Sequence, residues 1–341
     1  MDKIGGNAIV IREINVNLVR QALKERGKAT KRELAEATGL SLVTAATVLQ
    51  QLVAQGEVSE AGMVSSMGGR PAQQYAYNDE YALALILFPL EHEGRSRLHT
   101  YVVTQTGRRL VDTAVDVDQV DLEGFEHVID GMLERFAAIR AIGFGLPGAE
   151  VNGAMVVSDY RALLGLPVTE HFKQRYRLPV IIENDVNAAV IGYCSRLPHA
   201  DSASVVYVFF PDRFPPGAGI VLDGKLYRGS RGFAGEVSNI PLGIPWGEAL
   251  NASFEPLTEA IAKLTVSLAG VLNPQQVVLC GSFLQAEHVK EIEKRCGEWL
   301  PDGTVPEIRL SPDLIADYLA GMIKLTLAKL EPHWQLTKID G

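Results

Sequence analysis

The sequence has no apolar run long enough to cross a bilayer, although hydrophobic residues make up 47% of its 341 residues. A spanning helix needs about 18 to 20 consecutive apolar residues. The run ALALILF is followed at once by Pro89 and Glu91, which is typical of a strand and its end. The N-terminus also has no basic, apolar and small-residue pattern of a signal peptide. These absences predict a cytoplasmic protein with no membrane partner.

Cysteine is scarce, and the three residues present are odd in number, widely spaced and set among apolar neighbours: Cys194, Cys280 and Cys296. This pattern favours neither a disulfide framework nor a zinc site, so we expect three buried thiols and no metal. The histidines are scattered, and none is assigned to catalysis.

Length and charge suggest more than one domain. A chain of 341 residues exceeds one ordinary hydrophobic core, so two or three domains are expected. Residues 1–78 hold 9 Lys or Arg and 7 Asp or Glu, which gives +2, and the remainder holds 23 against 34, which gives −11. Polyanions are therefore favoured at the N-terminal end.

The N-terminal segment predicts three helices. The first, INVNLVRQALKERG, stops at Gly27 and places one apolar face inward, formed by Ile14, Leu18, Val19, Ala22 and Leu23. The second opens with a capping box, in which Thr30 and Glu33 bond each other's backbone amide, and ends at Gly39. The third has an inward stripe formed by Ala45, Val48, Leu49 and Leu52.

A short helix, a glycine turn and a longer helix are the elements of a helix-turn-helix, whose second helix enters the DNA major groove. Ser41 caps this helix, and its outer face offers hydroxyl and methyl groups that can contact bases. Two short strands, GEVSEAG and YAYN, are expected to form a wing with Gly68 and Gly69 at its tip. The expected DNA-contacting residues are Lys31, Arg32, Ser41, Val43, Thr44, Thr47 and Arg70. The alternative is a plain three-helix bundle with a hairpin, and a solvated helix face would also explain the basic residues of the second helix.

Residues 71–80 are interpreted as a linker. From about residue 81, strands alternate with helices, which argues for an α/β fold with a mixed sheet in each of two lobes. Ligands of such folds lie where strand ends meet loops, and between lobes.

Four stretches in order, FGLPGAEVNGAMVVSD, LPVIIENDVNAAVIG, GAGIVLDGKLYRGSRGFAGEVSNIPLG and VVLCGS, follow an N-terminal segment that contains GGRP. Together they resemble the ROK family of repressors and sugar kinases over nearly the whole chain. The resemblance implies a two-lobed actin-like ATPase (ribonuclease H-like) fold with a hexose in the cleft. The predicted domains are residues 1–78, a winged helix-turn-helix; residues 79–191 with 313–341, the first lobe; and residues 192–312, the second lobe.

The resemblance also implies ligand-binding residues. Asp185 matches the base that takes a proton from the sugar hydroxyl in the family's kinases, Asn184 matches an amide that bonds the sugar, and Glu236 matches an acid that binds sugar hydroxyls. The expected ligand-binding residues are Gly148, Asn184, Asp185, Glu236 and Asn239. The alternatives are that Asn184 and Asp185 only cap the following helix, and that Glu236 is an ordinary solvated acid.

Phosphoryl transfer needs glycine backbones that approach the phosphates. Where the family has a first phosphate loop, Asp-x-Gly-x-Thr, this chain has FPLEHEGRSR. The second loop is replaced by PDRFPP, whose prolines remove amide donors, and the third keeps only Gly281. The family's zinc site has a His where this chain has Asn239, followed by a cysteine cluster that is absent from this sequence.

The sequence therefore predicts a transcriptional regulator, a repressor, that binds a double-stranded DNA operator as a homodimer or homotetramer. Its ROK-like part is expected to bind a sugar or sugar phosphate without catalysis, cofactor or metal. The alternatives are an active ATP-dependent sugar kinase with an accessory DNA-binding domain, and a DNA-binding protein whose kinase-like part only forms oligomers.

Overall fold

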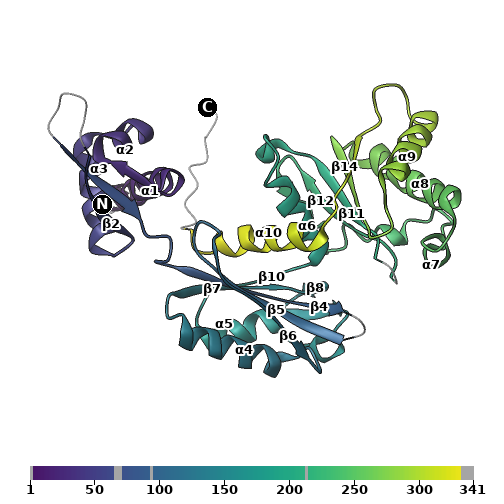
Figure 1. The fold of residues 1–341 in the computed structure, drawn as a ribbon, viewed down its shortest axis with the longest axis horizontal. Coiled ribbons are helices and arrows are strands. Elements are labelled where there is room, and N and C mark those ends of the chain that lie inside the picture. Colours follow the sequence, from purple (N-terminus) through teal and green to yellow (C-terminus); the bar gives the residue numbers. More distant parts are fainter. Residues whose placement is uncertain (1–2, 65–70, 93–94, 212–213, 332–341) are drawn as a thin grey trace.

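The structure is a computed structural model that describes residues 3–64, 71–92, 95–211 and 214–331. The strands of these described residues form four sheets, with strand orders β1-β3-β2, β10-β7-β4-β5-β6, β13-β12-β11-β14-β15 and β8-β9. We call the unit from α1 to β3 the head, the unit around the sheet β10-β7-β4-β5-β6 the first lobe, and the unit around the sheet β13-β12-β11-β14-β15 the second lobe. Figure 1 shows the head and the second lobe at opposite ends, with the first lobe and helix α10 between them.

The described part of the head forms three helices and a three-stranded sheet. Its elements are α1 (Lys3–Arg26), β1 (Lys28–Thr30), α2 (Lys31–Thr38), α3 (Leu42–Ala54), β2 (Val58–Val64) and β3 (Ala72–Tyr77). The predicted capping box is confirmed, because Thr30 accepts from Glu33 N–H and Glu33 accepts from Thr30 N–H. Gly39 ends α2 in the left-handed region (φ 70°), and Ser41 caps α3. The predicted inward stripe of α3 is also confirmed, because all of its residues are buried.

Two expectations for the first helix were wrong. α1 begins at Lys3, earlier than the apolar pattern indicated. Leu18 is 43% exposed, whereas Val16 is 2% exposed and packs with Val19 and Leu23. The buried residues Val16, Val19 and Leu23 therefore follow the helical spacing i, i+3 and i+7. The predicted face included Leu18 and left out Val16.

The expected hairpin is present but longer than predicted, and it carries a third strand. β2 and β3 pair antiparallel with a bulge between Glu60 and Met63, and β1 pairs with β3. β3 contains residues 75–77 of the predicted strand YAYN and also residues 72–74, which were interpreted only as linker, so that the connection to the first lobe is residues 78–82. The tip that carries Arg70 lies outside the described residues.

No single helix among the described residues is long and apolar enough to cross a membrane. Helices α2 and α3 have the length and composition of a membrane span only when they are counted as one segment, and they are bent by 114° at the break between them.

The first lobe is built on a strand that is buried on both faces. The strands of its sheet are β4 (Leu83–His92), β5 (Arg95–Val103), β6 (Arg109–Val117), β7 (Ile139–Gly145) and β10 (Val180–Glu183). Leu83 and Leu85 of β4 face a core shared with helices α4 (Leu122–Arg135) and α5 (Val168–Tyr176). Ala84 and Phe88 face the opposite core, which contains α6 (Asp185–Cys194) and α10 (Leu314–Leu327). Side chains alternate across a strand, so a continuous apolar run fits a sheet covered on both sides.

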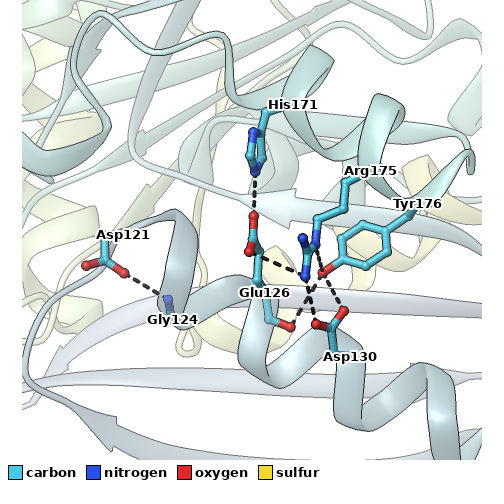
Figure 2. A network of polar contacts seen from close by, with 7 residues as sticks. All are labelled: Asp121, Gly124, Glu126, Asp130, His171, Arg175 and Tyr176. Atoms are coloured by element: carbon cyan, nitrogen blue, oxygen red, sulfur yellow. Dashed lines mark hydrogen bonds and ion pairs between the residues drawn. The ribbon is translucent and has the colours of Figure 1, made fainter.

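A polar network fixes α5 on α4 at the surface of this lobe (Figure 2). His171 Nε2 lies 2.6 Å from Glu126 Oε1. Asp130 accepts from Arg175 Nη2 and from the Tyr176 hydroxyl, each at 2.9 Å. These contacts join two helices that cover one face of the sheet, and their role is structural.

The second lobe combines antiparallel and parallel pairing. The strands of its sheet are β11 (Val205–Phe209), β12 (Gly217–Leu222), β13 (Lys225–Leu226), β14 (Gln276–Cys280) and β15 (Glu307–Leu310). β11 is antiparallel to β12 and parallel to β14. The helices are α7 (Trp246–Ala249), α8 (Phe254–Leu272) and α9 (Ala286–Trp299). Val205 and Tyr207 of β11 reach the core that also holds Phe88, so one core joins the two lobes.

Helices α6 and α10 touch backbone to backbone in this joint core. A Cβ on Gly192 would lie 1.9 Å from Asp317 O, and a Cβ on Gly321 would lie 1.8 Å from Ala188 O. Only glycine fits such a close approach of two backbones. We call this contact the α6–α10 crossing.

Candidate functional site

Four of the residues expected to contact DNA lie at the N-cap and first turns of α3, namely Ser41, Val43, Thr44 and Thr47. Ser41 Oγ accepts from Thr44 N–H (3.1 Å) and shares a hydrogen bond with Thr44 Oγ1 (2.8 Å). Thr47 Oγ1 donates to Val43 O (3.0 Å). Each hydroxyl thus has a local partner but keeps acceptor capacity. Val43 is 76% exposed and presents its methyl groups to solvent.

Thr44 and Thr47 also border a groove between α3 and α1. The groove has a volume of about 380 Å³, and its other lining residues are Ile11, Arg12, Asn15, Val48 and Gln51. Arg12 Nη2 donates to Gln51 Oε1 (2.8 Å), so a cation stands beside the predicted face. Arg12 was not expected here, because the apolar pattern placed the start of the helix later.

The expected phosphate contacts differ in their surroundings. Lys31 and Arg32 are exposed in the first turn of α2. Arg32 Nε lies 2.8 Å from Glu36 Oε1, so its charge is locally compensated. Arg70 is outside the described residues.

The second candidate site lies where the parallel strands of the first lobe end. Asn184 follows β10 and caps α6, because its Oδ1 accepts from Val186 N–H (3.0 Å) and Asn187 N–H (3.2 Å). Asp185 Oδ1 also accepts from Val186 N–H (2.9 Å). The alternative that Asn184 and Asp185 only cap α6 therefore accounts for the side-chain carbonyl of Asn184. The cap does not use the side-chain amide group of Asn184 or Asp185 Oδ2.

Glu183, which was not among the expected ligand residues, is the buried acid of this site. It is 5% exposed and accepts from Asn184 N–H (3.2 Å) and Asn187 Nδ2 (3.1 Å). It also forms an ion pair with Arg228, which comes from the loop after β13 in the second lobe. This ion pair links the two lobes at the end of β10.

Glu236 reaches the same region because two segments rest on β12. A Cβ on Gly219 would lie 2.4 Å from Val186 O, which places the first turn of α6 against this strand. Gly235, at φ 101°, accepts from Ala218 N–H (2.8 Å), and a Cβ on it would lie 2.0 Å from Ala218 O. The exposed Glu236 follows directly and acts electrostatically on Asp185.

The other two expected ligand residues lie at the margin. Asn239 is exposed and donates its N–H to Glu236 O (3.1 Å) at the end of a one-turn helix, Val237–Asn239. Gly148 has φ 128° and opens strand β8 (Gly148–Val151), which pairs with β9 (Ala154–Ser158). Asn184, Asp185 and Glu236 are therefore the expected residues that the fold brings together.

Negative charge accumulates around Asp185. Burial raises the pKa of Asp185 to about 6, and the carboxylates of Asp159 and Glu236 act in the same direction. Burial also raises the pKa of Asp159, and Glu91 adds to this shift. In the sequence, Asp159 ends the stretch FGLPGAEVNGAMVVSD that carries the family resemblance, but this acid was not selected.

A phenol lies beneath the acids. The Tyr318 ring packs on Phe88, with ring centroids 4.6 Å apart, and its hydroxyl sits against Gly145 at the end of β7. Among the described residues this buried hydroxyl has no hydrogen-bond partner. Burial raises its pKa, and Asp185 contributes to the shift, so the hydroxyl stays protonated beside the carboxylate.

Residues 94–249 match the family profile described as "ROK family". This segment is a ROK domain. The chain is 24% identical to the xylose repressor of Caldicellulosiruptor bescii, over 69% of this chain and 60% of that protein. It is 20% identical to the DNA-binding transcriptional dual regulator NagC of Escherichia coli, over 79% of this chain and 67% of that protein. The matched part thus spans 60% of the length of the xylose repressor.

Solved structures agree with the ROK sugar-kinase-like fold. The crystal structure of a ROK family transcriptional regulator, a homolog of the E. coli MLC protein, superposes with a TM-score of 0.69 at 19% identity and covers 94% of this chain and 97% of that chain. The ROK hexokinase of Thermus thermophilus superposes with a TM-score of 0.58 at 18% identity over 73% of this chain and 98% of its own. The expected mixed α/β ROK fold is thereby confirmed.

The described residues of the stretch expected at the first phosphate loop lie in strands β4 and β5, and residues 93–94 between these strands are outside the described residues. Phe88 pairs with His99, Leu90 with Arg97 and Glu91 with Ser96 in the antiparallel β4–β5 ladder. In an antiparallel ladder only alternate residues bond to the partner strand, so this pairing sets the course of the two strands, and the missing Asp-x-Gly-x-Thr residues are the change at this stretch.

The stretches at the other two phosphate loops are also altered. The chain between β11 and β12 includes Pro215 and Pro216, which have no amide N–H. A Cβ on Gly281 would lie 3.1 Å from Phe210 O, so the neighbouring backbone covers this glycine.

No group of three or more His, Cys, Asp or Glu residues in the described part of the chain could hold a metal ion. The expectation of buried thiols is confirmed, because Cys194, Cys280 and Cys296 are all free and buried. Burial raises the pKa of Cys194 and Cys296 to about 11, which keeps these thiols protonated.

Proposed function

We propose that this chain is a sequence-specific DNA-binding transcriptional regulator, a repressor, whose ROK domain binds a small molecule without phosphorylating it. The observation that carries the proposal is the contrast within the two lobes. Asn184, Asp185 and Glu236 converge, whereas the stretch at the first phosphate loop lacks the Asp-x-Gly-x-Thr residues and Pro215 and Pro216 stand at the second. A site that keeps the polar groups for a polyol but has no loop for a triphosphate suits recognition. Relatives that are named repressors support this choice.

The head is the proposed DNA-binding part, a winged helix-turn-helix of residues 1–78. In its support, α2 and α3 meet at a left-handed Gly39, and the β2–β3 hairpin follows α3 as a wing would. The proposed contacts come from Ser41, Val43, Thr44 and Thr47 on α3, from Lys31 and Arg32 on α2, and from Arg70 at the hairpin tip. The first lobe would comprise residues 79–191 with 313–341, and the second lobe residues 192–312.

The proposed ligand is a sugar or sugar derivative. Carboxylates and amides are good partners for sugar hydroxyls, and relatives include a protein named xylose repressor and an Escherichia coli O6:H1 protein named N-acetylglucosamine repressor. Glu91, Asp159, Asp185 and Glu236 make the site acidic, and Arg228 is already paired with Glu183. A phosphate group would meet uncompensated negative charge here, so an uncharged or amine-bearing sugar is favoured over the sugar phosphate considered from the sequence.

The proposed setting is the cytoplasm, with the regulator acting as a homodimer or homotetramer. Two heads of a symmetric oligomer match two half-sites about one DNA turn, or a multiple of it, apart. Closure of the lobes around a ligand would shift the heads relative to one another and weaken operator binding.

The test begins with duplexes that the full-length chain selects from a random pool. Binding to a selected duplex is then measured by fluorescence anisotropy, with D-xylose and N-acetylglucosamine each added in turn, beside a thermal-shift series with the same sugars. We expect tight binding to the selected duplex, weak binding to a shuffled one, and release by at least one sugar. Failure to enrich any sequence would refute the proposal. Sugar-dependent ADP release that disappears in the Asp185→Ala variant would instead establish the kinase alternative.

A sugar that raises the melting temperature but leaves DNA binding unchanged would show that the ROK domain binds this sugar without controlling DNA binding. Unchanged DNA binding and melting temperature with every sugar tried would favour the third possibility, a ROK domain that only forms oligomers.

A further inference from the structure

The short connection between head and first lobe is held at both of its ends. On the head side, Asn78 donates its N–H to Glu57 O and its Nδ2 to Gly56 O, each at 2.9 Å. Tyr77 N–H donates to Gly27 O at 3.0 Å. These bonds fix the first residue of the connection to the head.

The next two residues are fixed to the turn between β5 and β6 in the first lobe. Asp79 accepts from Arg108 Nη2 (3.1 Å), Arg108 Nε (3.2 Å) and Thr106 Oγ1 (2.9 Å), and its carbonyl accepts from Gln105 N–H (3.0 Å). Arg108 Nη2 also donates to Glu80 (2.7 Å). A fork of guanidinium N–H groups on one carboxylate fixes direction as well as distance.

A second contact joins the head to the first lobe elsewhere. Glu331, beyond the end of α10, accepts from Gln21 Nε2 (3.1 Å) and lies 3.6 Å from Lys24 Nζ. α10 packs on β4 and β7, so this contact also belongs to the first lobe. One exposed pair contributes little free energy. Two separated attachments, however, restrict rotation in a way that a single covalent connection does not.

The two lobes, by contrast, share a joint core that contains the α6–α10 crossing, and they also meet at the Glu183–Arg228 pair. Figure 1 shows α10 running between the second lobe and the head, along the first lobe. The residues that attach the head are therefore different from those that join the two lobes at the ligand site.

We infer that the head and the first lobe move as one rigid body, and that Arg108 is the positioning residue that holds them together. This inference rests on the proposed function for its regulatory meaning. Closure around a ligand then moves the second lobe against the combined head and first lobe, and residues 78–82 do not act as the hinge. A signal from the ligand site would reach DNA through the orientation of the first lobe in the oligomer.

The test measures a distance inside the full-length protein. Spin labels are placed on cysteines introduced at the exposed Gln55 of the head and Glu134 of the first lobe, because the native cysteines are buried. Pulsed dipolar spectroscopy, with the labelled chain diluted in unlabelled chain, should give a single narrow distance peak. The peak should keep its position when D-xylose or N-acetylglucosamine is added.

The decisive comparison is between two neighbouring arginines. Arg108→Ala should abolish the narrow peak, whereas Arg109→Ala should retain it, because the Arg109 guanidinium contacts Asp112 and the Tyr101 ring, both within the first lobe. The side chains of both arginines are 52% exposed, so neither substitution is expected to unfold the chain. A broad distribution in the unsubstituted protein, or a narrow one in Arg108→Ala, would overturn the inference.

The measurement needs neither DNA nor a bound sugar. If the chain selects no duplex but keeps the narrow peak, the proposed function fails while the rigid attachment stands. If the chain binds DNA but shows the broad distribution, the proposed function stands and the rigid attachment fails.

Discussion

Replacement of Asp185 by Asn should stabilise the folded protein near neutral pH. The folded environment raises the pKa of this carboxyl from 3.8 to about 6, mainly through burial. Ionisation of Asp185 therefore costs more free energy in the folded protein than in the unfolded chain. Asn has nearly the same shape and keeps an oxygen that can accept from Val186 N–H.

The sign and size follow from linkage. Because the folded-state pKa is the higher one, the stability of the parent protein falls as pH rises from about 4 to about 6 through this group. One pKa unit corresponds to about 1.4 kcal/mol, so the shift of about two units corresponds to at most about 3 kcal/mol. Asp185 is only half-buried, and screening by water should reduce the gain to about 1 to 2 kcal/mol. This advantage of the Asn variant should be absent below about pH 4 and complete above about pH 6.

Urea unfolding of both proteins across pH 4.5 to 7.5 provides the measurement. We expect the difference in unfolding free energy to grow with pH in favour of Asp185→Asn. A difference that is independent of pH, or a variant that is less stable at pH 7.5, would refute the account of a destabilised carboxylate. A Glu134→Gln variant, at an exposed position of α4, serves as the matched control for loss of one carboxylate and should show no such trend.

Three further changes test other parts of the structure. Gly321→Ala should destabilise the protein by about 3 kcal/mol in urea unfolding because its methyl group would enter the α6–α10 crossing, whereas Gly131→Ala, in open space on α4, should stabilise it by up to about 1 kcal/mol. Ser41→Ala should cost about 1 kcal/mol through loss of the α3 cap, and Ser253→Ala, at an N-cap without a side-chain bond, should cost little; similar losses would show that the cap contributes nothing. Arg228→Ala should lower the unfolding free energy by about 1 to 3 kcal/mol, because Glu183 then stays buried without its cation, and an unchanged melting curve would contradict this.

Local signals in the sequence were sufficient for the helices α2 and α3 of the head. The Thr30–Glu33 box, Gly39 and Ser41 each act through backbone bonds within a few residues, so their effect does not depend on the rest of the fold. The start of α1 was missed because its first turns lack the apolar periodicity that packing produces. β1 was missed because a strand of three residues gives no periodic signal.

The ligand site was only partly predictable, because its members come from distant segments. Asn184, Asp185 and Glu236 were found through motif resemblance. Glu183 was passed over although it precedes Asn184, since an acid at the end of a strand gives no sign that a residue of the other lobe, Arg228, will pair with it. Tyr318 shows the same limit, as its place beneath Asp185 depends on how α10 packs on the sheet.

The place of Phe88 in the joint core bears on how this protein could change in evolution. If the stretch from Phe88 to Glu91 were merely short of the right side chains, a few point mutations could return it to nucleotide chemistry. Here Phe88 is also part of the core that joins the two lobes, with its ring packed on Tyr318. A polar residue in its place would be buried in that core, at a cost in stability. A mutational route back to a working nucleotide loop is thus long and passes through less stable intermediates.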